Sequence, residues 1–296
     1  MPDFFNVIVN KTDDSLNPQE TRNYGLFIQV NETNFAFAVL DYKRNKYISI
    51  HHFKKNEYSH RAGHTGKPSY DDFLKGIVTA IPWLKNPFKT VKIAYEGKKS
   101  TLIPAPLYDA NEQIEYLRFN FPMGSDEKAF ADHLVHLDNF NVYSIPEATL
   151  NTIQNHFRGI HIIHNTSLVI DSIWMNYKNR LNANRAFIHI REKQFDLMII
   201  DGRQMSYFNS FPWVSPEDVA YYLIFVLEQL GYNPENIPVV LLGNVERSST
   251  LHELLFRYVR QVEFGKRNET FKFSYIFNQI SSQAFYSLLN FAQCGL

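Results

Sequence analysis

Short apolar runs separated by polar turns open the first half of the chain. The runs cover residues 24–30, 35–41 and 47–50, and clusters of Asn, Lys and Arg bound them. Aromatic and β-branched residues are frequent in each run, which is typical of antiparallel strands joined by tight turns. We therefore expect a three-stranded antiparallel meander here.

The same pattern returns 160 residues further along the chain, in residues 187–190, 195–201 and 207–208. The matched pairs are Phe27 with Phe187, Ile28 with Ile188, Phe35 with Phe195, Asp41 with Asp201 and Tyr47 with Tyr207. Aromatic residues make up 15% of the chain, so chance identities are common and the shared strand and turn lengths carry more of the match. Such self-similarity predicts a duplicated structural unit.

Each meander is followed by an amphipathic helix and then by a fully apolar strand. Ser69 and Ser215 are predicted N-caps with acidic residues in the first turn, and Gly231 is expected to end the second helix. The apolar stretches 91–94 and 239–242 come next. An apolar run after a helical crossover is typical of a parallel central strand.

Beyond this strand the two halves differ in length. A predicted helix at 250–259 follows the second strand almost directly, whereas the comparable helix of the first half, 147–157, comes only after extra sequence at about 104–145. Within this insertion we expect a helix near 112–119 and a hairpin. The two strands of that hairpin are predicted at 133–137 and 141–145.

Each half is predicted to close with a strand and a helix. The predicted pairs are 160–163 with 167–177, and 272–277 with 281–291. The complete unit is then β-β-β-α-β-α-β-α, present twice. We expect two domains, 1–178 with the insertion and 179–296, which suits a chain of 296 residues.

A duplicated ribonuclease-H-like (βββαβαβα) unit resembles the actin, sugar-kinase and Hsp70 superfamily of ATPases. The whole chain is also similar to an uncharacterised bacterial family of comparable length with that fold. The resemblance rests on element order and repeat register rather than on catalytic motifs. It implies an α/β, actin-like two-domain fold, and a fold alone does not establish a function.

Working ATPases of that superfamily carry Asp-x-Gly-x-Thr/Ser in the first hairpin of each half. Glycine lets the backbone present its amides to phosphate, and the aspartate holds the metal or its water. Residues 30–35 and 190–195 occupy these hairpins, and neither stretch contains glycine or aspartate. The paired glycines expected after the fourth strand are reduced to Gly243. The resemblance therefore implies a superfamily member whose ATP site is lost.

Four residues near these motifs are candidates for residual nucleotide or phosphate contact. Gly243 and Asn244 follow a buried strand, and ligands favour the carboxyl ends of parallel strands. Arg191 and Lys193 flank the second hairpin turn and are placed to meet an anion. The competing interpretation is an ordinary strand-to-helix turn and two solvated turn residues. The first interpretation implies ATP with magnesium as the cofactor, and the second implies none.

Composition argues against several functions. Lys and Arg together number 30, and so do Asp and Glu, so the chain lacks the basic footprint of a nucleic-acid binder. No apolar stretch approaches the roughly 20 residues of a membrane span, and the first residues lack the cationic start of a signal peptide. A single cysteine, Cys294, fits a reducing compartment. We expect a cytoplasmic protein without membrane insertion.

Patterns for metal binding and catalysis are weak. The candidate ligands are His51, His52, His60, His64, His133 and His136. A zinc site needs three or four converging ligands, and no cysteine lies near these histidines. The sequence contains no Gly-x-Ser-x-Gly motif, which is the pattern that indicates a serine hydrolase. We therefore expect neither a metal nor a catalytic residue.

A nuclease built on this kind of sheet needs a metal-binding carboxylate in the middle of its first strand. Gln29 and His189 hold those positions. Asp41 and Asp201 lie at the ends of the second strands, where they more often shape turns. The nuclease interpretation therefore fails on its chemistry.

Two hypotheses remain. The first is a non-catalytic actin-like scaffold or adaptor that binds a protein partner, and the alternative is a nucleotide- or small-molecule-binding enzyme that acts in the cleft between the domains. Long insertions on a regular scaffold often carry binding surfaces, so the apolar residues of the insertion are either an interface or a layer packed on the first domain. These residues are Leu107, Tyr108, Tyr116, Leu117, Phe119, Phe121 and Met123.

Overall fold

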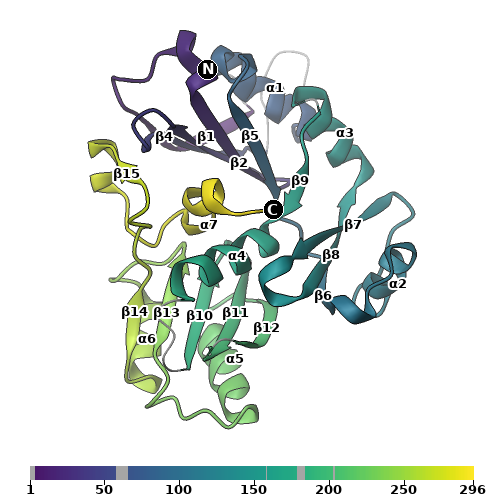
Figure 1. Ribbon diagram of the computed structural model, residues 1–296, viewed down its shortest axis with the longest axis vertical. Helices are drawn as coiled ribbons and strands as arrows, with labels where there is room; N and C mark the ends of the chain where they lie inside the picture. The colour runs from purple at the N-terminus through teal and green to yellow at the C-terminus, as the bar shows by residue number, and fades with distance from the viewer. Residues whose placement is uncertain (1–3, 58–65, 158, 179–183, 203) are drawn as a thin grey trace. The chain divides into compact units, whose positions relative to one another are not determined.

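The computed structural model describes residues 4–57, 66–157, 159–178, 184–202 and 204–296 (Figure 1). The chain divides into two compact units. Unit 1 comprises Met1–Leu168, Thr270–Asn278 and Phe291–Leu296, and unit 2 comprises Val169–Glu269 and Gln279–Asn290. Each unit contains one mixed β-sheet, and unit 1 also carries a small antiparallel sheet. The domain boundary at residue 178 that the repeat predicts stays a prediction.

The large sheet of unit 1 has the strand order β1-β4-β3-β2-β5-β9, with β15 paired to β4. Its strands are β1 (Phe5–Thr12), β2 (Tyr24–Val30), β3 (Asn34–Asp41), β4 (Lys46–Lys55), β5 (Thr90–Tyr95), β9 (Ile162–His164) and β15 (Lys272–Phe273). β2, β3 and β4 form the predicted antiparallel meander, and β5 and β9 continue the sheet in parallel. The apolar pattern does not predict β1, because most of its side chains are exposed.

The sheet of unit 2 has the order β12-β11-β10-β13-β14. Its strands are β10 (Arg185–Ile190), β11 (Gln194–Asp201), β12 (Gln204–Pro212), β13 (Val239–Gly243) and β14 (Val262–Phe264). The first three strands are antiparallel and the last two are parallel. Order and directions therefore repeat β4-β3-β2-β5-β9 of unit 1, which confirms the predicted duplication.

The first hairpin keeps the predicted register in both units. Phe27 pairs with Ala38 in unit 1, and Phe187 pairs with Met198 in unit 2. Ala38 and Met198 are thus separated by the same 160 residues as Phe27 and Phe187. Because a slip of one residue would exchange the two faces of a strand, equal register means that equivalent side chains face the core in each unit.

A β-bulge interrupts the pairing of the second and third strands directly after Val39 in unit 1 and directly after Ile199 in unit 2. Directly after the bulge, Leu40 pairs with Tyr47 in unit 1. The equivalent Ile200 pairs with Met205 in unit 2. The predicted match of Tyr47 with Tyr207 is therefore wrong by two residues. The cause is the turn before β12, which is two residues shorter than the turn before β4.

The helices agree with the predicted pattern, with shifts of a few residues at their ends. They are α1 (Tyr70–Ala80), α2 (Gln113–Arg118), α3 (Glu147–His156), α4 (Asn165–Tyr177), α5 (Pro216–Gln229), α6 (Thr250–Tyr258) and α7 (Tyr286–Asn290). Short 3-10 helices cover Pro18–Asn23, Pro82–Lys85, Ala105–Leu107, Ala110–Glu112, Val135–Leu137, Tyr275–Gln279 and Phe291–Gln293. Within the described residues, no helix combines the length and the apolar character that crossing a membrane requires.

The predicted helix caps are confirmed. The Ser69 hydroxyl accepts the backbone N–H of Asp72, whose carboxylate accepts the N–H of Ser69 in return. At the start of α5 the Asp218 carboxylate accepts the N–H of Ser215 at 2.9 Å. Gly231 follows α5 in a left-handed conformation with φ of 74°, which glycine adopts without strain.

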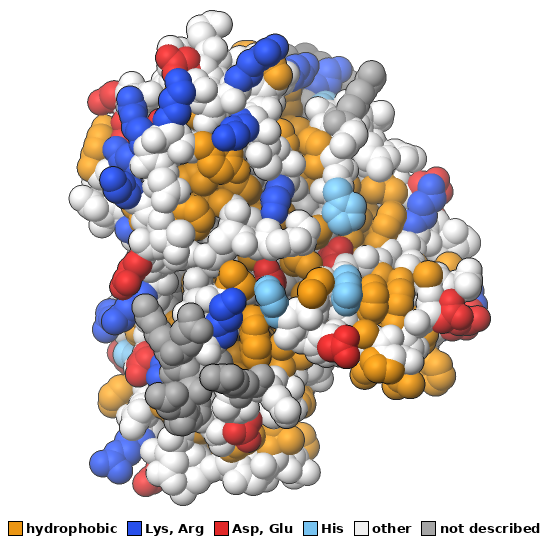
Figure 2. Space-filling view, viewed as in Figure 1, with side chains coloured by type: hydrophobic (Ala, Val, Ile, Leu, Met, Phe, Trp, Pro, Cys, Tyr) orange, Lys and Arg blue, Asp and Glu red, His pale blue; other side chains and the backbone are white. Residues whose placement is uncertain are grey.

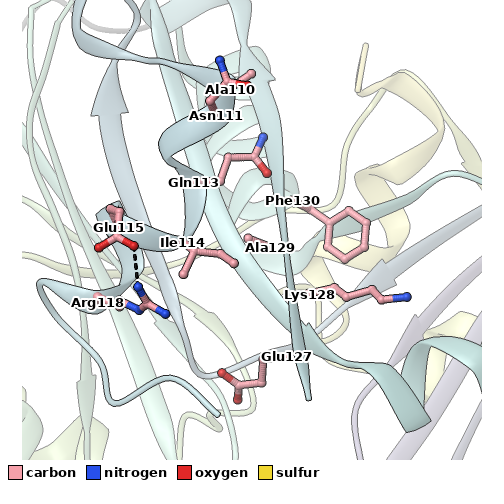
Figure 3. Close-up of a pocket in the computed structure, with 10 residues that line it drawn as sticks. All are labelled: Ala110, Asn111, Gln113, Ile114, Glu115, Arg118, Glu127, Lys128, Ala129 and Phe130. Carbon is pink, nitrogen blue, oxygen red and sulfur yellow. Dashed lines mark hydrogen bonds and ion pairs between the residues drawn. The ribbon is translucent and has the colours of Figure 1, made fainter. Parts of the chain in front are cut away.

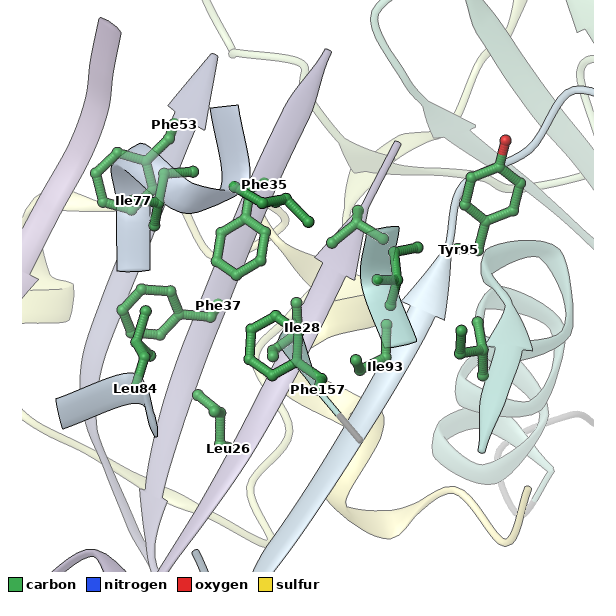
Figure 4. Packing of buried hydrophobic residues seen from close by; sticks show 14 of the residues in the cluster. Leu26, Ile28, Phe35, Phe37, Phe53, Ile77, Leu84, Ile93, Tyr95 and Phe157 are labelled. Carbon is green, nitrogen blue, oxygen red and sulfur yellow. The ribbon is translucent and has the colours of Figure 1, made fainter. Parts of the chain in front are cut away.

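In unit 1 both faces of the large sheet are covered. α1 and α3 pack on one face, where the Phe157 ring stacks on Phe35 at 6.1 Å and Ile77 lies over the strands (Figure 4). The opposite face is covered by the last residues of the chain, with Phe291 against Phe27. Burial on both faces explains why the strands read as continuous apolar runs.

Unit 2 uses the same two-sided arrangement. α5 and α6 supply Val219, Leu223 and Leu255 to the core on one face of the sheet. On the other face Tyr177 of α4 contacts Phe187 edge to face, with ring centroids 4.7 Å apart.

The predicted closing strand 272–277 of the second half is wrong. Lys272–Phe273 forms β15, which pairs in parallel with β4 of unit 1, and the fifth strand of unit 2 is β14. Phe273 stacks on Tyr47 at 5.5 Å, so this aromatic segment finds its burial in unit 1. In place of the predicted helix 281–291, the structure has the shorter helix α7, Tyr286–Asn290.

The insertion forms a three-stranded antiparallel sheet in the order β6-β8-β7 with α2 packed on it. The strands are β6 (Ser100–Pro104), β7 (Glu127–Leu134) and β8 (Asn139–Pro146). The predicted hairpin is present, but its first strand ends where 133–137 was expected to begin. The turn is made by a 3-10 helix and by Asp138, which has a left-handed φ of 51°.

Asp132 fixes β7 to the rest of unit 1. Its Oδ2 accepts hydrogen bonds from the Ser167 hydroxyl at 2.6 Å and from the His164 backbone N–H at 2.7 Å. Its Oδ1 lies 3.2 Å from the Tyr143 hydroxyl oxygen, within hydrogen-bond distance. Burial raises the pKa of Asp132 to about 6, although these hydrogen bonds and the nearby His161 act in the opposite direction.

We expect Asp132→Asn to remove a pH dependence from unfolding. The folded pKa of Asp132, about 6, lies above the ordinary value of 3.8, so the folded protein holds this proton more tightly than the unfolded chain. The free energy of unfolding of the wild type should therefore fall, relative to that of the variant, by about 2 kcal/mol from about pH 4 to about pH 7. In the variant the carboxamide N–H can donate to Tyr143, whose hydroxyl donates to the Ile162 carbonyl at 2.8 Å.

Urea unfolding at several pH values measures this difference. The matched control is Asp138→Asn, an exposed position in the same insertion whose left-handed backbone asparagine also tolerates. A gap between wild type and Asp132→Asn that stays constant with pH would contradict the assignment.

Candidate functional site

The first hairpin, between β2 and β3, satisfies its own backbone groups. The side-chain oxygen of Asn31 accepts the N–H groups of Thr33 at 2.9 Å and Asn34 at 2.7 Å. The N–H of Asn31 in turn donates to the Asn34 carbonyl at 3.0 Å. A phosphate-binding hairpin offers such amides to its ligand, but here an asparagine side chain occupies two of them.

The second hairpin, between β10 and β11, is held by a buried charge network. Arg191 Nη2 donates to Asp196 Oδ1 at 2.6 Å, and the Ser210 hydroxyl donates to the same oxygen at 2.6 Å. His189 Nδ1 lies 3.1 Å from Asp196 Oδ2. Trp213 Nε1 donates to the Arg191 carbonyl at 3.0 Å. The Arg191 guanidinium therefore bonds to the next strand of its own hairpin.

Charge pairing decides the ionisation of Asp196. Burial raises the pKa of this carboxyl, but the Arg191 guanidinium and the hydrogen bonds from His189 and Ser210 outweigh burial and hold the pKa well below its usual range. Arg191 is 7% exposed and Asp196 is 1% exposed. A buried ion pair of this kind is costly to break, because loss of either partner leaves an unpaired charge.

The turn after β13 is equally closed. Gly243 has φ of 83°, and a Cβ at this position would lie 2.3 Å from the Ile190 carbonyl oxygen, so close packing against β10 requires glycine. Its N–H donates to the Gln283 carbonyl at 2.9 Å, and the Asn244 N–H donates to the Ile190 carbonyl at 2.9 Å. The side chain of Asn244 is exposed.

The structure brings three of the four candidate binding residues to the carboxyl ends of β10 and β13, two neighbouring strands of the sheet of unit 2. Gly243 pairs with Ile190 at the ends of two parallel strands, so Gly243 and Asn244 lie beside the hairpin that carries Arg191. Lys193, at the tip of this hairpin, is exposed to solvent. A binding role for these four residues stays a prediction.

The histidines do not gather into one site. His60 and His64 lie outside the described residues. His51 is stacked on Phe37 with ring centroids 4.5 Å apart, and burial lowers its pKa to about 4. His133 stacks on Phe140 at 4.4 Å. Among the residues that the structure describes, no group of three or more His, Cys, Asp or Glu is arranged to hold a metal ion.

A cavity of about 520 Å³ lies in the insertion, between α2 and β7. The residues that line it are Ala110, Asn111, Gln113, Ile114, Glu115, Arg118, Glu127, Lys128, Ala129 and Phe130. Figure 3 shows Ile114 on α2 pointing toward Ala129, while Lys128 and Phe130 point away from α2. The lining therefore includes both faces of β7.

The charges around this cavity are neutralised by close partners. Glu115 pairs with Arg118 on α2. Glu127 accepts Lys99 at 2.8 Å, and Lys128 lies 2.7 Å from Glu147 at the start of α3. A site with balanced, internally paired charges is poorly suited to a multiply charged ligand such as a nucleotide.

The sequence pattern does not reveal this cavity. α2 has six residues and its amphipathic pattern is correspondingly short, and β7 was expected several residues too late. The alternation over 127–134 was the available signal, with small Ala129 and Ala131 on one face and Phe130 and Leu134 on the other.

The chain resembles known proteins along nearly its whole length. A family described as "protein of unknown function (DUF3822)" matches residues 13–262. A Bacteroides thetaiotaomicron protein with an actin-like ATPase fold and unknown function is 19% identical, with a TM-score of 0.74 over 94% of this chain and 99% of that one. The PilM–PilN type IV pilus biogenesis complex contains a chain that is 12% identical, with a TM-score of 0.61 over 91% of this chain and 97% of that one. No curated protein matches. These likenesses confirm the actin-like α/β fold.

We expect Arg191→Ala to destabilise unit 2 by about 3–5 kcal/mol, because the variant leaves Asp196 buried without its cation. The matched control is Lys193→Ala, two residues away and exposed, which should change stability by less than about 0.5 kcal/mol. Urea unfolding of both variants at neutral pH measures the difference. Equal and small losses would mean that the Asp196 carboxylate does not depend on Arg191.

Proposed function

The chain belongs to the family described as protein of unknown function DUF3822, and we propose that it acts as a non-catalytic, actin-like scaffold or adaptor that binds a protein partner through its insertion. In this proposal the ATP site of the fold is lost. The observation that carries the proposal is a contrast between two regions. The polar groups of the hairpins at the expected phosphate positions bond within the protein, whereas the insertion exposes large apolar side chains to solvent.

Loss of the ATP site is supported by the chemistry of both hairpins. Residues 30–35 and 190–195 contain neither glycine nor aspartate, and phosphoryl transfer depends on amides and a metal held at such positions. Asn31 engages the amides of the first hairpin, and Arg191 is held by Asp196 in the second. Binding a triphosphate would require these internal contacts to be exchanged.

Partner binding is supported by the surface of the insertion. Leu107, Phe119 and Val135 expose 69%, 89% and 69% of their surface, and Figure 2 shows hydrophobic side chains at the surface over this region. Leu107 and Val135 lie in the 3-10 helices Ala105–Leu107 and Val135–Leu137, and Phe119 directly follows α2. Large apolar side chains left exposed in this way support an interaction site. Of the other insertion residues considered for an interface, Leu117 is a buried residue of α2, and Tyr108, Tyr116, Phe121 and Met123 are partly buried.

The PilM–PilN complex supports the same proposal from a related fold. In that complex a protein of this architecture is bound to a protein partner. At 12% identity the likeness carries the fold alone, so the type of partner and the place where it binds are argued from the residues of this chain.

We expect ATP with magnesium to leave the melting temperature of the protein unchanged. A ligand present at 100 times its dissociation constant would stabilise the folded state by about 2.7 kcal/mol, which a thermal-shift measurement detects easily. A rise that grows with ATP concentration and disappears in Lys193→Ala would contradict the loss of the site. That result would favour a nucleotide-binding enzyme.

We expect the variant Leu107→Ser/Phe119→Ser/Val135→Ser to lose its partner while it keeps its fold. All three side chains are exposed, so their replacement should cost little stability. Quantitative affinity capture from the native cell extract, compared between wild type and variant, measures the loss for each captured protein.

The matched control replaces exposed apolar residues of unit 2, in the variant Val214→Ser/Tyr221→Ser/Phe225→Ser. If both triple variants lose the same proteins to the same degree, the capture reflects general stickiness and the insertion is not the interface. Point variants are preferable to deletion of 106–144, because Asp132 and Tyr143 within that stretch are buried in unit 1.

A further inference from the structure

The strand β7 forms an unusually regular edge of the insertion sheet. Among the described strands it pairs with β8 alone, and all eight of its residues pair without a register shift. The comparably long edge strands β1 and β12 each contain a register shift. Such bulges discourage the addition of another strand, whereas a long, regular edge permits it.

The hydrogen-bond pattern identifies which residues of β7 present their backbone at this edge. The Glu147 N–H donates to the Asp126 carbonyl at 2.8 Å, and hydrogen-bonded pairs alternate along an antiparallel ladder. Lys128 and Phe130 therefore bond to β8. The residues whose N–H and C=O groups point to the open edge are Glu127, Ala129, Ala131 and His133.

The other side of β8 gives the same assignment. The Ser144 N–H donates to the Lys99 carbonyl at 3.3 Å, toward β6. Ser144 lies opposite Ala129 in the register of β7 and β8. Because Ser144 turns its backbone toward β6, the backbone of Ala129 is not used by β8.

The cavity of the insertion lies along this open edge. Four consecutive residues, 127–130, line it, although successive side chains of a strand point to opposite faces. A single cavity can touch all four only by following the edge of the strand. On one side Ile114 of α2 faces Ala129 (Figure 3). Both residues line the cavity, so a small apolar side chain can enter between them.

Charge defines the occupant further. The charged residues of the lining are two acidic and two basic, Glu115, Arg118, Glu127 and Lys128, and each has a partner within ion-pair distance. A ligand that carried net charge would find no counter-charge to meet. A neutral peptide backbone with apolar side chains at alternate positions is complementary to this lining.

We propose that an extended, uncharged segment of the protein partner adds to β7 as a fourth strand of the insertion sheet. This inference rests on the proposed function and names the binding mode within it. The backbone of the segment bonds to Ala129 and Ala131, and a small apolar side chain sits between Ile114 and Ala129. Main-chain bonds supply affinity, and this side-chain position supplies selectivity.

Proline variants test the mode of binding. Ala129→Pro removes an N–H at the open edge without removing a bond to β8, and proline is tolerated at such edge positions. Ala131→Pro does the same one pair further along, which covers the case that one variant folds poorly. Ala129→Ser keeps the N–H and is the matched control. Circular dichroism and melting temperature check the fold of each variant.

The probe is a phage-displayed library of random peptides of about ten residues, selected on the full-length protein. We expect a synthetic copy of the enriched peptide to bind wild type and Ala129→Ser equally, and to bind both proline variants about tenfold or more weakly. Hydrogen exchange should show the amides of Ala129 and Ala131 slowed by the peptide, while those of Lys128 and Phe130 are protected already.

Three results would overturn the proposal. The first is equal binding of the peptide to the proline variants, and the second is enrichment of no sequence over Ala129→Pro protein. The third is a wild-type dimer that Ala129→Pro converts to a monomer, which would assign the edge to a second copy of this chain. None of these results changes the outcome of affinity capture with the Leu107, Phe119 and Val135 variant, so failure of the binding mode is distinguishable from failure of the proposed function.

Discussion

The structure depends on the pairing of one strand in each unit on both of its edges. β2 bonds to β3 and β5, and β10 bonds to β11 and β13. Phe27 and Phe187, at equivalent positions of these strands, are completely buried, so a slip of one residue would force an aromatic ring onto the opposite face. This constraint fixes which face of each sheet the helices cover. The rest of each unit, including the bulge after Val39 and Ile199, is arranged around the two central strands.

The same strands end at the positions where the fold binds phosphate in working ATPases, and here the polar groups at those ends bond to one another. Asn31 caps its own turn, Arg191 and Asp196 neutralise each other, and the amide of Gly243 bonds to Gln283. Buried polar groups need partners, and a ligand can supply them only if the protein does not. A closed hairpin is thus a physical alternative to a bound phosphate, and each internal bond raises the cost of admitting one.

Much of the fold could be predicted from the sequence, because helix caps, apolar periodicity and the repeat all depend on residues close together in the chain. What could not be predicted depends on distant partners. The aromatic run around Phe273 indicates burial, but the pattern cannot say that Tyr47 and β4 provide it. Arg191 has the composition of a solvated turn residue, and only the position of Asp196 on the next strand draws it inward. The cavity was missed for the same reason, since it exists only where the six-residue helix α2 lies beside β7.

The expected nucleotide position and the proposed recognition edge differ in where their backbone hydrogen bonds go. Every backbone N–H and C=O needs a partner in the protein or in water, and the described hairpins of both units use theirs locally. In β7 the groups of Glu127, Ala129, Ala131 and His133 face the open edge. Backbone groups that could bond to another chain are therefore found at the edge of β7, whereas those of the two hairpins bond within the protein. The insertion, like β1 and β15, is present in unit 1 and has no counterpart in unit 2, so the proposed recognition edge lies in a part of the chain that the duplicated unit does not require.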